Sequence, residues 1–210
     1  MASVVQICNM ALAHIGAGVV ISSINPPDGS LEAGYCDTYY NPARLEMLEI
    51  GTWKFSLARV ELAEVTNTSD TWAYAYALPS NCLRPLRILA AGSTLTVFTQ
   101  DDVAYSPNDR DGAEFDIEGA VLYTNEPEAV LVYTRDVTDS TQFTPSFMTA
   151  LSYLLGSYLA GPIIKGTEGM RVADAMRQRA MVMSTMSATA DANASSSSID
   201  FTPSSIAARA

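Results

Sequence analysis

The chain has 210 residues and few positive charges. Its 12 Lys and Arg face 23 Asp and Glu, which gives a formal net charge of −11. Binding of a phosphate backbone needs clustered Lys and Arg, so a conventional DNA- or RNA-binding surface is not expected. Charged residues of both signs make up only 17% of the chain, whereas hydrophobic residues make up 48%. This composition is typical of a folded chain with an ordinary core and not of an intrinsically disordered one.

Residues that bind metals or act as nucleophiles are scarce. Cys8, Cys36 and Cys82 form no C-x-x-C pair, so we expect buried free thiols and no disulfide framework. His14 is the only histidine, and we expect it to be a packed or surface residue because nothing near it has the pattern of a Ser-His-Asp site. The glycine-rich nucleotide-binding motifs and the G-x-S-x-G motif are missing as well. We therefore expect no metal, no cofactor and no enzymatic activity.

Long apolar runs are also missing. The most apolar stretch, residues 153–164, is interrupted by Gly156, Gly161 and Pro162, whereas a membrane-spanning helix needs about 20 residues. The N-terminus lacks the positively charged start of a signal peptide. We expect a protein that stays inside a cell and has no membrane partner.

The first fifty residues have a helical pattern. Ser3 followed by Gln6 is a capping-box pattern at the start of one helix, and Gly16 marks its end. A second helix is predicted over residues 30–52, with a kink at Pro42.

The helical pattern returns near the C-terminus. Thr144-Pro145 is a good helix start, and we expect Gly161-Pro162 to break the helix that follows it. A last helix is predicted over residues 167–186. The remaining residues, 187–210, are rich in Ala, Ser and Thr and predict a flexible or extended arm.

Between the helical regions the pattern favours short antiparallel strands separated by turn residues. The candidate strands are residues 57–62, 73–77, 84–89, 95–98, 114–118, 120–124 and 130–134. Glu118-Gly119-Ala120 is typical of a tight hairpin.

The fold class predicted is α+β. Helices from residues 1–56 and 141–186 pack together as one bundle, because each has an apolar face that needs a partner. An antiparallel β region, residues 57–140, is inserted between the two halves, and the arm of residues 187–210 follows.

Acidic residues concentrate in one stretch. Residues 101–128 contain nine Asp and Glu and a single arginine. On a strand, the alternation around Phe115 and Ile117 places three carboxylates on one face. The acidic residues of interest are Asp101, Asp102, Asp109, Asp111, Glu114, Asp116 and Glu118.

Four interpretations of this stretch stay open. It is a solvated hairpin face, a calcium loop around Asp109 and Asp111, a channel wall or nozzle-facing surface that repels a polyanion, or a carboxylate pair for glycoside hydrolysis.

Two further features indicate binding to another protein. The arm keeps isolated apolar anchors in a Ser- and Ala-rich background, which favours docking over plain disorder. The anchors are Ile199, Phe201, Pro203 and Ile206. Methionines suit surfaces that repack, and five of them lie in the last predicted helix, at positions 170, 176, 181, 183 and 186.

Four stretches together resemble one family. They are Ile7-Cys8-Asn9-Met10-Ala11-Leu12 with Ile15-Gly16; Arg44 to Leu48 running into Trp53-Lys54-Phe55-Ser56-Leu57-Ala58-Arg59; Trp72-Ala73-Tyr74-Ala75-Tyr76-Ala77-Leu78-Pro79-Ser80-Asn81-Cys82-Leu83-Arg84; and residues 143–162. The chain resembles the tail tubular protein A, or head-to-tail adaptor, family of short-tailed bacteriophages over residues 3–165. It departs from the family pattern at Asn81, where Asp is expected.

The resemblance implies a structural virion protein in the tail, at the neck below the portal vertex, that is made in the host cytoplasm. It implies a ring of twelve copies that contacts the portal protein on one side and the tail nozzle hexamer (tubular protein B) on the other. Genomic DNA passes through such a ring without specific binding, and the C-terminal segment grips the portal. The alternatives are a tail-associated polysaccharide hydrolase and a neck completion protein of different ring symmetry.

Overall fold

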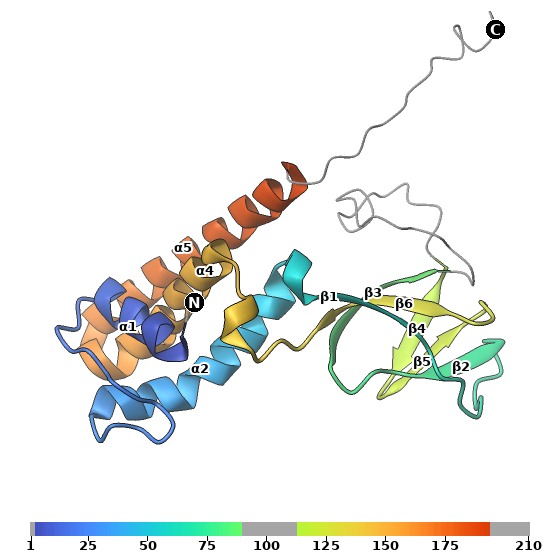
Figure 1. The fold of residues 1–210 in the computed structure, drawn as a ribbon, viewed down its shortest axis with the longest axis horizontal. Helices are drawn as coiled ribbons and strands as arrows, with labels where there is room; N and C mark the ends of the chain where they lie inside the picture. Colours follow the sequence, from blue (N-terminus) through green and yellow to red (C-terminus); the bar gives the residue numbers. More distant parts are fainter. Residues whose placement is uncertain (1–2, 90–112, 194–210) are drawn as a thin grey trace, which may run out of the picture.

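Two lobes make up the protein in the computed structural model, which describes residues 3–89 and 113–193 (Figure 1). A helical lobe contains α1, α2, α4 and α5, and a β lobe contains six described strands. The chain enters the β lobe after α2 and returns to the helices after β6. The predicted α+β fold is confirmed, with the β region inserted between the two halves of the helical bundle.

Three of the four described α-helices start at capping residues. The four helices are α1 (Val4–His14), α2 (Leu31–Ile50), α4 (Pro145–Ile164) and α5 (Gly166–Asn193). The side-chain oxygens of Ser3, Ser30 and Thr144 each accept a hydrogen bond from the backbone N–H three residues on, at 3.1, 3.2 and 3.3 Å. Gly16 follows α1 with a φ of 76°, a conformation that favours glycine. The predicted helix starts at Ser3 and Thr144 and the helix end at Gly16 are confirmed.

The C-terminal helices differ from the prediction in two places. Gly161-Pro162 does not end α4, because Pro162 lies in its last turn and the Lys165 N–H still bonds to the Gly161 carbonyl at 3.0 Å. The break falls instead at Lys165 and Gly166, which both have a φ of 63°. α5 then continues to Asn193 instead of ending at 186. Three alanines in this extension favour helix, whereas the sequence interpretation took the Ala-rich composition for an arm.

α4 is the central helix of the bundle and packs against α1, α2 and α5. Its fully buried side chains include Phe147, Leu151, Leu154, Leu155 and Leu159. The two halves of the chain meet in one core, to which α1 and α2 contribute Ile7, Cys8, Ala11, Leu12, Ala33, Cys36, Ala43, Met47 and Leu48. Burying one Leu or Phe side chain fully stabilises the fold by about 1.5–3 kcal/mol. The shared core therefore holds the N-terminal and C-terminal parts of the chain together.

By length and composition alone, α4 is apolar enough to cross a membrane, with a mean hydropathy of 1.4. It is longer than the sequence indicated, because its glycines and Pro162 do not interrupt it. Half of its most apolar stretch is buried inside the protein. Because α4 packs against three other helices, its apolar composition is explained by its place in the core.

The described strands form two three-stranded antiparallel sheets, not the single central sheet expected. The strands are β1 (Leu57–Glu61), β2 (Tyr74–Ala77), β3 (Cys82–Leu89), β4 (Phe115–Glu118), β5 (Val121–Thr124) and β6 (Val130–Arg135). Their orders are β1-β6-β3 and β2-β5-β4. The strand predicted at 95–98 lies outside the described residues.

The two sheets are joined along both sides. Ile88 of β3 bridges to Ala113, just before β4. On the other side, the segment after β1 pairs with β2, where the Val65 N–H donates to the Ala75 carbonyl at 2.8 Å. The six strands therefore close into a barrel-like ring, which removes most of the open sheet edge. A core of its own fills this ring: Leu62, Tyr76, Ile88, Leu122, Ala129, Leu131 and Tyr133.

Trp53 lies at the passage from α2 to the β lobe and is 1% exposed. Its Nε1–H donates to the Met47 carbonyl at 2.8 Å, and its ring meets that of Phe147 edge-on at 4.9 Å between centroids. Gly51 lies directly beside the indole, so a Cβ built on Gly51 would be 2.4 Å from Nε1. Only glycine fits there.

We expect Gly51→Ala to lower the free energy of unfolding by about 1–3 kcal/mol, because the added methyl displaces the Trp53 ring. Gly34→Ala, within α2, is the control, since a Cβ there meets nothing within 4 Å. The control should leave stability unchanged or raise it by up to about 1 kcal/mol. Urea denaturation followed by Trp fluorescence measures both, and equal stability of the two variants would contradict this packing.

Candidate interaction surfaces

The acidic strand predicted from the sequence is β4. Glu114, Asp116 and Glu118 are exposed, while Phe115 and Ile117 pack against the barrel core. β4 pairs with β5 through a two-residue turn in which Gly119 has a φ of 61°. The predicted hairpin and the predicted alternation of carboxylate and apolar faces are both confirmed. Asp101, Asp102, Asp109 and Asp111 lie outside the described residues.

The arrangement of these carboxylates suits repulsion of an anion better than catalysis. Neighbours on one face of a strand stand about 7 Å apart and point to solvent. A sugar-cleaving pair needs one carboxyl group in apolar surroundings, which exposed side chains do not provide. Within the described residues, no group of three or more His, Cys, Asp or Glu is placed to hold a metal ion. The calcium loop interpretation depends on residues 109–112, outside that range.

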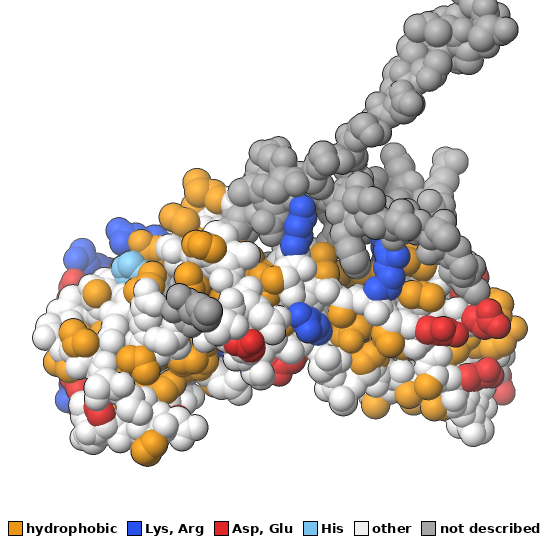
Figure 2. All heavy atoms as spheres, viewed as in Figure 1, with side chains coloured by type: hydrophobic (Ala, Val, Ile, Leu, Met, Phe, Trp, Pro, Cys, Tyr) orange, Lys and Arg blue, Asp and Glu red, His pale blue; other side chains and the backbone are white. Residues whose placement is uncertain are grey.

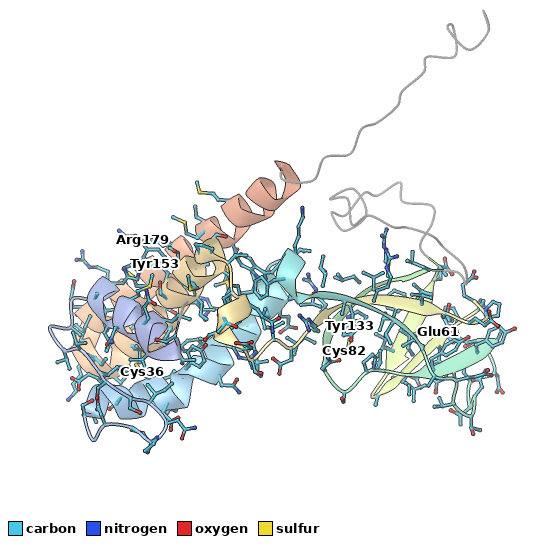
Figure 3. All side chains as sticks on the ribbon, in the orientation of Figure 1. Cys36, Glu61, Cys82, Tyr133, Tyr153 and Arg179 are labelled. Atoms are coloured by element: carbon cyan, nitrogen blue, oxygen red, sulfur yellow. The ribbon has the colours of Figure 1, made fainter. Side chains whose placement is uncertain are left out.

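Acidic side chains gather at the end of the β lobe that is remote from the helices, on the face shown in Figure 2. Glu61, at the end of β1, lies in this region (Figure 3). Lys and Arg side chains on the same face lie on the bundle, near the junction of the lobes and over the β lobe, and single Asp and Glu side chains also lie on the helical lobe. The far end of the β lobe is therefore acidic on this face, whereas the rest of the face carries both signs of charge.

His14 is packed between helices, as predicted. Its Nε2 lies 3.1 Å from Ser152 Oγ, and its ring stacks on Tyr153 at 4.1 Å between centroids. Burial, and secondly the positive charge of Arg179, lower the pKa of His14 below its usual value. Ser152 was not singled out from the sequence. It is fully buried and its hydroxyl donates to the Thr149 carbonyl at 2.8 Å, so the pair is a packing contact and not an accessible nucleophile.

Two of the three thiols are buried side chains of the bundle core. Cys8 and Cys36 come from α1 and α2, and both are free. Contact with Cys36, together with burial, strongly raises the pKa of Cys8. Cys82 is free but only half-buried, and its burial raises its pKa to about 11. The raised pKa values of Cys8 and Cys82 do not suit a nucleophile, and Cys36, whose pKa is lowered by its hydrogen bond with Cys8, is fully buried.

An open hollow of about 530 Å³ lies between α4 and α5. It is lined by Tyr153, Ala175, Gln178, Arg179, Val182 and Met183. The Arg179 guanidinium lies 6.0 Å from the centre of the Tyr153 ring, and the two side chains approach each other on this side of the bundle (Figure 3). We name this surface the Tyr153 hollow. The sequence interpretation missed it, because its α4 residue, Tyr153, lies far in sequence from its α5 residues.

The methionine positions have different environments. Met176 belongs to the bundle core and Met181 and Met183 are half-buried, whereas Met170 and Met186 are 66% and 61% exposed. Only part of the predicted methionine surface is therefore available to a partner. The predicted anchors of the arm lie outside the described residues: Ile199, Phe201, Pro203 and Ile206.

Residues of the family-like stretches join the two lobes. Arg44, in α2, is only 2% exposed and forms an ion pair with Asp136, just after β6. Its guanidinium also donates to the Val137 carbonyl at 2.8 Å and to Asn41 Oδ1 at 2.7 Å. We call the contacts of Arg44 and Trp53 the neck, because they hold both passages between the lobes. The name refers to this part of the chain and not to the neck of a virion.

The Trp72–Arg84 stretch builds the barrel side of the neck. Tyr74, Tyr76 and Leu78 turn inward to the barrel core, which explains the alternation of large residues with alanine. Asn81 makes two hydrogen bonds beside the neck. Its Oδ1 accepts from the Tyr133 hydroxyl at 3.1 Å, and its carbonyl accepts from the Asp136 N–H at 2.8 Å. The departure from Asp to Asn therefore keeps a hydrogen-bond acceptor.

Three helices are also tied by one carboxylate. Glu46 of α2 accepts hydrogen bonds from the Tyr158 hydroxyl of α4 and from the Arg177 guanidinium of α5. The hydrogen bond to Glu46 raises the pKa of Tyr158 above its usual value. This polar contact fixes the rotation of α5 against the other helices.

No protein-family model matches the chain, and no curated protein matches it with significant similarity.

We expect Asp136→Ala to lower the free energy of unfolding by about 2–4 kcal/mol, because it leaves the buried Arg44 guanidinium without its counter-charge. Glu168→Ala is the control, since its pair with Arg171 is exposed and should contribute less than about 1 kcal/mol. Thermal and urea denaturation measure both variants. A loss at Asp136 no larger than that at Glu168 would contradict the role of the neck.

Proposed function

We propose that the protein is a structural subunit of a phage virion, a head-to-tail adaptor that assembles as a ring between the portal protein and the tail nozzle. One observation carries this proposal. Two residues of the stretches that resemble the adaptor family, Arg44 and Trp53, hold the two lobes together. Such residues are the ones an architectural protein needs.

The two lobes offer separate surfaces for two partners. The helical lobe carries α5, which leads directly into the C-terminal arm, and this lobe would contact the portal. The β lobe has its own core and would contact the nozzle. A single chain with two independently packed ends suits a connector between two rings of different symmetry.

The exposed carboxylates on β4 support a place beside the DNA channel. Glu114, Asp116 and Glu118 form one acidic row. Repeated around a ring, this row would repel phosphates, so that DNA slides past without binding. A row that faces the nozzle would repel DNA phosphates in the same way at the exit of the channel.

Polysaccharide hydrolysis is less well supported, because the described carboxylates of the acidic strand, Glu114, Asp116 and Glu118, are exposed and lie on a single strand face. A neck completion protein would share the same architecture and differ in copy number. The copy number in the complex therefore distinguishes the two structural functions.

We expect the free protein to have the mass of one 22.5 kDa chain and to form a ring only on the portal. Ordering the arm costs conformational entropy that a partner surface offsets. Native mass spectrometry of the protein alone and mixed with its portal measures this. One copy per portal subunit is the expected result, and an unchanged mass with portal present would overturn the adaptor function.

A deletion of residues 194–210 tests the arm separately. This variant should stay folded, because it keeps every core residue that the structure describes in the bundle, the last of which is Ala180. It should bind the portal at least tenfold more weakly if the arm supplies a docking segment. Portal affinity equal to that of the full chain would refute the portal-binding role of the arm.

Asp116→Lys with Glu118→Lys tests the channel face. The lysines would attract phosphates, so we expect virions with this ring to eject DNA on the order of tenfold more slowly at low salt. Glu168→Lys on the exposed surface of α5 is the charge control. Ejection at the control rate would show that the acidic row does not face DNA.

A further inference from the structure

The Tyr153 hollow has the chemistry of a site for a short peptide segment. The Tyr153 ring stacks on His14 and has the Arg179 guanidinium 6.0 Å from its centre. Val182 is 50% exposed and Met186 61% exposed, so apolar surface continues along α5 toward its C-terminal end. The hollow thus combines one cation with apolar walls. A segment that fits it has large apolar side chains next to a carboxylate.

The chain carries one such segment close by. The 17 residues after α5 contain only two charged residues, Asp200 and Arg209. Asp200 lies between Ile199 and Phe201, which are the first large apolar residues after the helix. The sequence Ile-Asp-Phe therefore supplies one carboxylate flanked by two apolar side chains.

The segment is within reach. Val182 precedes the end of α5 at Asn193 by a helical length of about 16 Å, and Arg179 by about 21 Å. From Asn193, the extended chain reaches up to about 20 Å at Ile199 and about 27 Å at Phe201. A chain that reverses after α5 therefore places Ile199 beside Val182 and Phe201 beside Arg179.

We propose that residues 199–201 of the free protein fold back into the Tyr153 hollow of their own chain. Asp200 pairs with the Arg179 guanidinium, and the flanking side chains cover the exposed apolar surface around Val182. The contact keeps these apolar anchors off other surfaces until a competing partner displaces them. This inference goes beyond the adaptor function and holds whichever partner the arm binds.

Disulfide trapping in the full-length chain tests the placement. Val182→Cys combined with Ile199→Cys, in a Cys82→Ala background, should form an intramolecular disulfide under copper-catalysed air oxidation. Met170→Cys with Ile199→Cys is the matched control, because Met170 is also exposed but lies about 34 Å from the end of α5, beyond the reach of Ile199. Non-reducing electrophoresis and mass spectrometry follow both pairs. We expect cross-linking at least tenfold faster at Val182 than at Met170.

Charge reversal tests the pairing of Asp200 with Arg179. Asp200→Arg should slow cross-linking of the Val182 pair severalfold, and a further Arg179→Asp should restore it. Arg171→Asp, on the exposed surface of the same helix, should not restore it. Three results would overturn the proposal: equal rates for the Val182 and Met170 pairs, cross-links between two chains, which would assign the hollow to a second copy, or no response to charge reversal.

Discussion

The buried guanidinium of Arg44 is the constraint on which the relation of the two lobes depends. A charge that is almost fully removed from water is tolerated only when it is paired and hydrogen-bonded. Arg44 meets this requirement with Asp136 and the Val137 carbonyl, both in the segment after β6 that returns from the β lobe. The returning chain is therefore held against α2. Trp53 holds the outgoing chain on the same helix, through its hydrogen bond to Met47.

The β lobe needs this attachment because it is small. Among the residues that the structure describes, its core consists of seven buried residues, whereas the bundle core contains more than three times as many. Closing two three-stranded sheets into a ring satisfies most edge groups, but the apolar area buried stays limited. Asn81 ties the start of β3 to β6 through Tyr133 and the Asp136 N–H. Asp136 in turn pairs with Arg44 of α2, so the two lobes share polar contacts as well as chain passages. The neck thereby stabilises the barrel and fixes its position.

Local patterns in the sequence predicted local structure well. Ser3 and Thr144 marked helix starts because an N-cap acts within one turn, and the alternation around Phe115 and Ile117 predicted β4 because a strand face depends only on parity. Errors came where distant contacts override local preference. Pro162 lies in a helix that tertiary packing continues past it. The His14–Ser152 contact and the Tyr153 hollow join residues that are more than twenty positions apart, which no periodicity reveals.

The length of α5 is the feature that the bundle itself does not require. α4 has 20 residues and α5 has 28, and the two form an antiparallel pair, so the end of α5 extends about 12 Å past the start of α4 (Figure 1). A short helical segment gains most of its stability from packing, and Ala-rich composition adds only a little to it. The exposed Met186 lies where the support from α4 ends. An overhanging helix with apolar residues at its base gains stability from any surface that covers it, and this makes the end of α5 the point of the bundle where binding and helix stability are coupled.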